Sequence, residues 1–199
     1  VAGISTGALA APFAFIGPEY DVVLRKLYTT TSTDEILKKR SVFAVLKADS
    51  LTDTGPLRKI LEDVIDGTVV QKIAIEHKKG RRLFIGTTNL DAERPVIWNI
   101  GAIATSGKPD ALKLIRDVLQ ASAAIPGMFP PVYFKVEAYG QTFDELHVDG
   151  GVASQVFLYP ASLDLEWLKK KIGLKGEDHI FIIRNSRLEP EWTPVTPRV

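Results

Sequence analysis

The sequence contains no cysteine among its 199 residues, which excludes disulfide bonds, thiolate metal sites and a cysteine nucleophile. Histidine is scarce as well, and the three present, His77, His147 and His179, lack the spacing of a metal site. Nor is charge of one sign in excess, because 25 Lys and Arg residues balance 24 Asp and Glu residues. A nucleic-acid-binding protein usually carries a much larger basic excess. We therefore expect no metal site and no nucleic-acid partner.

Long apolar runs are also absent. A membrane-spanning helix needs roughly 18 or more consecutive apolar residues, whereas the run from Ala8 to Ile16 is short and contains Pro12. The chain begins at Val1 immediately before a catalytic-looking turn, so we expect it to be a fragment. Any signal peptide or lipid anchor would then lie upstream.

The length and the hydrophobic content of 45% predict one globular domain with a sizeable core. We assign residues 1–188 to this domain. Residues 189–199 contain three prolines and show no periodicity, so we expect a surface tail there.

Helix-like and strand-like segments alternate along the chain. Small apolar residues at 8–15 predict a buried helix, and residues 109–124 predict the longest amphipathic helix. The segments 82–88 and 95–100 read as two strands joined by a polar turn, and the apolar segment 179–184 reads as a last strand. This alternation predicts an α/β domain with helices on both sides of a sheet.

The segment Gly3-Ile4-Ser5-Thr6-Gly7 has the pattern Gly-x-Ser-x-Gly, which places a serine on a sharp turn between a strand and a helix. Such a turn exposes the serine hydroxyl and directs the positive end of the next helix at the site. A loop that merely caps the helix beginning at Ala8 is the alternative. The small-residue helix that follows favours a nucleophile elbow.

A serine nucleophile needs a base, and the histidines supply it poorly. His179 borders an apolar run, and His147 in a strand would face the same side as Asp149. Asp149 is the stronger candidate, because the two glycines that follow it, Gly150 and Gly151, allow its carboxylate to approach another loop. An ordinary Asp-Gly turn is the alternative interpretation.

Four segments together resemble the patatin-like phospholipase family. In chain order they are the elbow with its helix, the stretch Ile85-Gly-Thr-Thr-Asn-Leu-Asp91, the break Ala121-Ser-Ala-Ala-Ile-Pro-Gly-Met-Phe-Pro-Pro131, and Asp149-Gly150-Gly151. The second of these looks typical of bacterial members. Each match alone is unspecific, but four matches in the family's order are specific.

This resemblance implies a three-layer α/β/α sandwich with a mainly parallel central sheet. It also implies a lipid acyl hydrolase of the phospholipase A or esterase type, in which Ser5 and Asp149 form a catalytic dyad and work through an acyl-enzyme. Neither a catalytic histidine nor a cofactor is implied. The family's oxyanion donors come from a glycine-rich loop upstream of the elbow. We expect the chain to lack that loop and the strand leading into Ser5, and to be poorly active alone.

Two other classes of function stay open. One is an esterase with a Ser-His-Asp triad through His179 or His147, and the other is a non-catalytic lipid-binding module of the same fold. The expected partner is a lipid or other ester substrate. The segment Leu165–Ile172, with Trp167 and three lysines, predicts either transient contact with a membrane surface or a solvated helix.

Overall fold

The computed structural model describes residues 1–30, 38–39, 52–53, 55–154, 157, 165–173, 175–177 and 179–185. The chain divides into two compact units, Val1–Leu158 and Tyr159–Val199. The elements of the first unit are β1 (Ala2–Gly3), α1 (Thr6–Ile16), η1 (Pro18–Tyr20), α2 (Asp21–Thr30), β2 (Lys38–Lys39), β3 (Thr52–Asp53), α5 (Gly55–Val64), α6 (Gly67–Lys78), β4 (Phe84–Asn89), β5 (Arg94–Asn99), α7 (Ile100–Ala104), α8 (Ala111–Ser122), β6 (Val132–Ala138), β7 (Gln141–Asp149) and η2 (Gly150–Val152). The second unit contains α9 (Leu165–Ile172).

Strand β4 is the centre of the main sheet, whose order is β1-β4-β7-β6 with β5 also paired to β4. All six residues of β4 pair with β5, so β5 occupies one edge of β4 completely. The other edge is shared, because β1 pairs with Phe84 and Ile85 while β7 pairs with residues 87–89. Since β1 runs parallel to β4 and β7 runs antiparallel, the two strands approach each other end to end along this edge.

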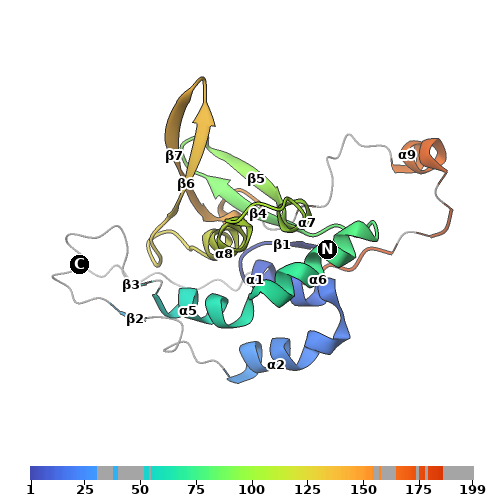
Figure 1. The fold of residues 1–199 in the computed structure, drawn as a ribbon, viewed down its shortest axis with the longest axis horizontal. Coiled ribbons are helices and arrows are strands. Elements are labelled where there is room, and N and C mark those ends of the chain that lie inside the picture. Colours follow the sequence, from blue (N-terminus) through green and yellow to red (C-terminus); the bar gives the residue numbers. More distant parts are fainter. Residues whose placement is uncertain are drawn as a thin grey trace, which may run out of the picture. The chain divides into compact units, whose positions relative to one another are not determined.

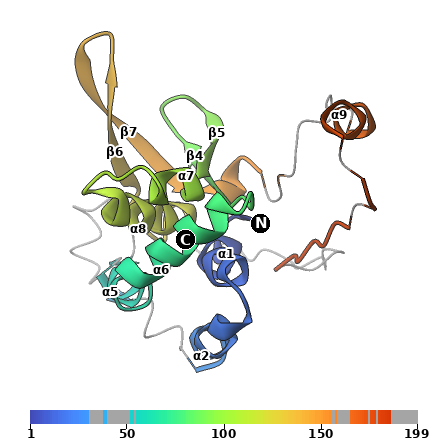
Figure 2. The same ribbon diagram turned by 45° about the vertical axis from the view of Figure 1, so that its right-hand side comes forward.

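The α/β class is confirmed, but the sheet is mixed. In the described part of the chain only β1 and β4 pair in parallel, whereas the β4–β5, β4–β7 and β6–β7 pairs are antiparallel. Two of these pairs are hairpins, and a short turn can join only antiparallel strands. The expectation that no strand leads into Ser5 is wrong, because β1 ends two residues before it. The β6–β7 hairpin extends well beyond the neighbouring strands (Figures 1 and 2).

Helices α1 and α8 pack directly on the sheet (Figure 1). Helix α1 is apolar on all sides and largely buried, as the small residues predict. Helix α8 lies against β4 and β7 through an apolar face, and α6 packs on α1. The core between these layers consists chiefly of aliphatic and aromatic side chains, among them Ala8, Phe13, Phe15, Ile73, Leu83, Ile85, Ile100, Ile115, Val118 and Leu119.

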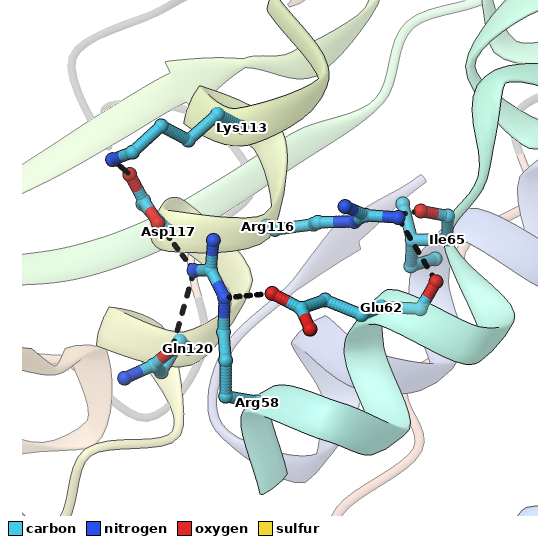
Figure 3. A network of polar contacts seen from close by, with 7 residues as sticks. All are labelled: Arg58, Glu62, Ile65, Lys113, Arg116, Asp117 and Gln120. Carbon is cyan, nitrogen blue, oxygen red and sulfur yellow. Dashed lines mark hydrogen bonds and ion pairs between the residues drawn. The ribbon is translucent and has the colours of Figure 1, made fainter. Parts of the chain in front are cut away.

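A polar network joins α5 to α8 at the edge of this core (Figure 3). The Arg58 guanidinium on α5 contacts the carboxylate of Asp117 on α8, and its Nε lies 3.0 Å from Oε1 of Glu62. From α8, Arg116 donates to the carbonyl oxygens of Ile65 and Glu62 at 2.8 and 2.9 Å. These carbonyls belong to the end of α5, which has no further helical turn to satisfy them.

The second unit is described around α9 and residues 179–185. The strand expected at 179–184 is wrong, because these residues are described and belong to no strand. Their apolar side chains are exposed, and an apolar run becomes a strand only where a partner edge pairs with it. In α9, Nζ of Lys171 lies 4.5 Å from the ring centroid of Trp167. Contact of α9 with lipid stays a prediction, and the expected tail at 189–199 lies outside the described residues.

None of the helices in the described ranges is long and apolar enough to cross a bilayer.

Candidate active site

Ser5 sits on a strained turn between β1 and α1. Its φ of 56° and ψ of −127° are rare for a residue with a side chain, and Ser5 serves as the N-cap of α1. A β-carbon on Gly3 would lie 2.8 Å from the Gly7 carbonyl carbon and 2.9 Å from Cβ of Ala11, so only glycine fits there. A β-carbon on Gly7 would meet no described atom within 4 Å. The backbone therefore has the geometry expected of a nucleophile elbow.

Asp149 meets Ser5 where β1 and β7 approach each other along β4. The Ser5 hydroxyl donates to Oδ2 of Asp149 at 2.6 Å, and Asp149 is 5% exposed. The other carboxylate oxygen, Oδ1, accepts from the Gly151 amide at 2.7 Å. One carboxylate oxygen thus forms an Asp-Gly turn while the other contacts the serine.

The two glycines after Asp149 allow this close approach. A β-carbon on Gly150 would lie 2.8 Å from the Gly86 carbonyl carbon and 3.0 Å from Cγ2 of Ile4. One on Gly151 would lie 3.0 Å from Oδ1 of Asp149. Larger side chains at either position would push the carboxylate away from Ser5.

Helix α1 adds a favourable field at the site. Its first residue is Thr6, so its N-terminal amides and the positive end of its dipole lie beside the Ser5 hydroxyl. No acidic residue occupies its first turn to neutralise that end. The Tyr28 hydroxyl on α2 donates to the Thr6 carbonyl oxygen and so ties α2 to this turn. Negative charge that develops near Ser5 would be stabilised by this arrangement.

Two residues at the end of α8 hold the backbones of both Ser5 and Asp149. The Ser5 amide donates to Oγ of Ser122 at 3.1 Å, and the Asp149 amide donates to the Ala124 carbonyl oxygen at 2.9 Å. The stretch 121–131 is one of the four segments that resemble the family, but its sequence alone indicates no role for it. Ser122 acts through its hydroxyl and Ala124 through its carbonyl oxygen, and the groups they bind are main-chain amides, so no pattern of charged or nucleophilic side chains marks them.

His147 does not contact Ser5. Its Nδ1 lies 2.9 Å from the Thr87 hydroxyl, and its Nε2 lies 3.3 Å from the Glu145 carboxylate. The indole of Trp98 donates to the same Thr87 hydroxyl at 2.8 Å, which leaves that hydroxyl's proton for Nδ1. Burial lowers the pKa of His147 below its ordinary value, although Glu145 opposes the shift. The ring is therefore neutral near pH 7, with its proton on Nε2.

His179 has an exposed side chain in the second unit, where its Nε2 lies 3.9 Å from the Glu177 carboxylate. His147 is therefore not placed between Ser5 and an acid, as a triad would require, in the described structure. Among the described residues, no three His, Asp or Glu side chains gather closely enough to hold a metal ion.

An apolar hollow of about 320 Å³ opens near the end of β7. Its walls come from the turn after β4, the break after α8 and strands β6 and β7, with Leu90, Phe129, Tyr133, Leu146 and Val148 among the lining residues. Successive side chains of a strand point to opposite faces, so Val148 points away from the face on which Asp149 meets Ser5.

A comparison with protein-family models matches most of the chain. Residues 1–162 match the model of a family described as Patatin-like phospholipase. A search of curated proteins found no match to the chain.

Proposed function

Because the chain belongs to the patatin-like phospholipase family, whose members are lipid acyl hydrolases, we propose that its reaction runs through Ser5 and Asp149. The substrates that membership of this family indicates are the carboxylic esters of lipids. The observation that carries the proposal is the 2.6 Å hydrogen bond from the Ser5 hydroxyl to Asp149. It gives the nucleophile a general base within the distance that proton transfer requires.

In the first half-reaction the Ser5 oxygen attacks the ester carbonyl carbon while Asp149 accepts the hydroxyl proton. The carbonyl oxygen becomes an oxyanion beside the N-terminus of α1. Collapse of this intermediate breaks the bond to the leaving alcohol, and Asp149 returns the proton to the alcohol oxygen. The acyl group is then an ester on Ser5.

In the second half-reaction water replaces the alcohol. The water oxygen attacks the acyl carbon while Asp149 accepts a proton from the water. Asp149 then returns that proton to the Ser5 oxygen as the bond between this oxygen and the acyl carbon breaks. The free fatty acid leaves and both residues are restored. The hydrogen bond from Gly151 to Oδ1 keeps Oδ2 directed at Ser5 through both steps.

The residues that flank Ser5 and follow Asp149 complete the proposed site. Gly3, Ile4, Thr6 and Gly7 form the elbow, while Gly150 and Gly151 form the acid loop. The proposed catalytic domain runs from residue 1 to residue 188.

Turnover of a medium-chain p-nitrophenyl ester and fatty-acid release from phosphatidylcholine vesicles test the proposal in the full-length protein. Ser5→Ala and Asp149→Asn are each expected to lose about 10³-fold or more in kcat, with circular dichroism confirming their folds. Asn at position 149 retains an oxygen for the Gly151 amide but cannot accept the serine proton. His147→Gln and His179→Gln are expected to retain turnover.

Three results would count against this mechanism. Activity in Asp149→Asn would exclude the dyad, and loss of activity in a folded histidine variant would favour the triad. A wild-type protein that binds lipid vesicles but cleaves no ester would favour the non-catalytic lipid-binding module. Mass spectrometry of protein treated with an alkyl fluorophosphonate adds a direct readout, because the adduct should form on Ser5.

A further inference from the structure

The Ser122 hydroxyl lies between the Ser5 backbone and strand β4, where a direct hydrogen bond between two strands would ordinarily form. Ser122 is the last residue of α8 and has no exposed surface. Its hydroxyl accepts from the Ser5 amide at 3.1 Å and donates to the Gly86 carbonyl oxygen at 2.6 Å. The side chain therefore joins the backbone of the nucleophile to the central strand β4.

The register of the sheet explains why a hydroxyl lies there. Ala2 pairs with Phe84 and Gly3 with Ile85, and the Phe84 amide donates to the Val1 carbonyl oxygen. In a parallel ladder, alternate residues of one strand bond to both neighbours of their partner. Continuing this series, the Ser5 amide would donate to the Gly86 carbonyl oxygen. Instead, the Ser122 hydroxyl lies between these two groups and relays the bond.

This relay allows Ser5 to leave the sheet without losing a hydrogen bond. The φ of 56° turns the Ser5 backbone away from the strand direction and presents its hydroxyl to Asp149. Without Ser122, the Ser5 amide and the Gly86 carbonyl would both lack this partner in a poorly solvated place, which is unfavourable.

The same short segment holds the other reacting residue. Two positions after Ser122, the Ala124 carbonyl oxygen accepts from the Asp149 amide at 2.9 Å. Residues 122–124 thus set the position of Ser5 on one side and of Asp149 on the other. The Ser5–Asp149 distance depends on both contacts, whereas the Ala124 contact uses the main chain alone and tolerates any side chain that fits.

We propose that Ser122 is a positioning residue for the hydrolytic reaction, which fixes the backbone of Ser5 so that its hydroxyl stays on Asp149. This inference rests on the function proposed above. Ser122 touches neither the substrate nor the transferred proton. Its contribution is to the fraction of enzyme in which the nucleophile and its base are aligned, and therefore to kcat rather than KM.

The test compares Ser122→Ala with Ser122→Thr in the full-length protein. Ser122→Ala removes the relay and is expected to lower kcat by about 10²-fold, the scale of a misplaced reacting group, with little change in KM. Ser122→Thr keeps a hydroxyl and is expected to recover most of that loss. Ser122→Cys replaces the hydroxyl by a weaker hydrogen-bonding group of similar shape and should fall between the two.

Thr87→Val is the matched control. Thr87 is also fully buried on β4, and its hydroxyl bonds to His147 and Trp98 rather than to Ser5. Both Thr87→Val and Ser122→Ala should lower the unfolding temperature, but only Ser122→Ala should lower kcat per folded molecule. The rate of Ser5 labelling by an alkyl fluorophosphonate should fall in parallel with kcat in the Ser122 series.

Equal effects of Ser122→Ala and Thr87→Val on kcat would overturn the proposal, since a lost buried hydroxyl would then explain both. Wild-type kcat and labelling rate in Ser122→Ala would overturn it as well. If Ser122→Ala does not fold, Ser122→Cys decides by the same criteria. Ser5→Ala separates the two proposals. If Ser5→Ala remains active, the proposed function fails. If Ser5→Ala is inactive while every Ser122 variant matches wild type, only the positioning role fails.

Discussion

The Thr87 hydroxyl lies 2.9 Å from Nδ1 of His147, on the strand that carries Asp149 two residues later. This contact uses the ring nitrogen that would otherwise be free, since Nε2 already faces Glu145. His147 is therefore part of a buried polar chain that begins at Trp98 and ends at Glu145. These contacts explain why a histidine lies two residues before Asp149 without assigning His147 a catalytic role.

The first prediction concerns acid stability. Burial lowers the pKa of His147 below its ordinary value of 6.5, so below about pH 6.5 the unfolded chain binds a proton that the folded chain does not. The free energy of unfolding should therefore decrease as the pH falls from 7.5 towards 5. Glu145 and Asp91 are the charged groups that oppose this shift. Urea unfolding at several pH values measures the slope.

The matched pair for this measurement is His147→Gln and His179→Gln. His147→Gln should flatten the slope, and His179→Gln is the control substitution of a histidine with an exposed side chain. An unchanged slope in His147→Gln would show that another group governs acid stability. Because the buried chain is separate from the Ser5 hydroxyl, both variants should still hydrolyse ester.

The second prediction concerns the strain at Ser5. A non-glycine residue at a φ of 56° and ψ of −127° costs about 1–3 kcal/mol, and glycine adopts such angles with little penalty. Ser5→Gly and Ser5→Ala both lose the hydroxyl, so the difference between them does not depend on the contact with Asp149 and contains the backbone strain. We expect Ser5→Gly to be more stable than Ser5→Ala by about 1 kcal/mol in urea unfolding. Equal stabilities would show that the turn relaxes without cost.

The third prediction separates the two glycines of the elbow. Gly3→Ala places a methyl group against Ala11 and the Gly7 carbonyl and should cost about 1–3 kcal/mol through overpacking. Gly7 lies in the first turn of α1 with open space around it, so Gly7→Ala should stabilise the helix by up to about 1 kcal/mol. Differential scanning calorimetry of the two variants should show shifts of opposite sign. A loss of stability in Gly7→Ala would contradict the open space at that position.

The Gly-x-Ser-x-Gly turn and the Asp-Gly-Gly segment could be singled out from sequence because each is a short local pattern. The structure then gives a reason for these glycines, because a β-carbon at Gly3 or Gly150 would collide with neighbouring atoms and one at Gly151 would lie 3.0 Å from Oδ1 of Asp149. The helix at 8–15 was likewise predictable, since small apolar residues on all sides indicate a buried helix.

The sequence did not indicate that β1 and β7, which are far apart in the chain, share one edge of β4. The end-to-end approach of β1 and β7 depends on pairings between residues far apart in the chain. Ser122 was missed for the same reason, because its partners are main-chain atoms 117 and 36 positions away. The apolar segment 179–184 shows the converse error, in which a strand-like composition lacks a pairing edge in the described structure.

The last prediction concerns the attachment of α8, the helix that carries Ser122. Arg58 contacts Asp117 across the α5–α8 interface, with side-chain exposures of 26% and 14%, whereas Lys72 and Glu19 form a more exposed ion pair with 37% and 55% (Figure 3 shows the Arg58 network). Partial burial reduces solvent screening, so the first pair should be the stronger.

In a double-mutant cycle of Arg58→Met and Asp117→Asn, we expect a coupling energy of about 1 kcal/mol. The same cycle at Lys72 and Glu19 should give a smaller coupling energy, because water screens this pair more. Urea unfolding at low and high salt provides the measurement, and salt should weaken the exposed pair more. Equal coupling in the two cycles would mean that partial burial does not strengthen the Arg58–Asp117 pair, and that the other α5–α8 contacts hold α8. In that case Arg58→Met, which preserves apolar volume, should leave the position of Ser122 and the labelling rate of Ser5 unchanged.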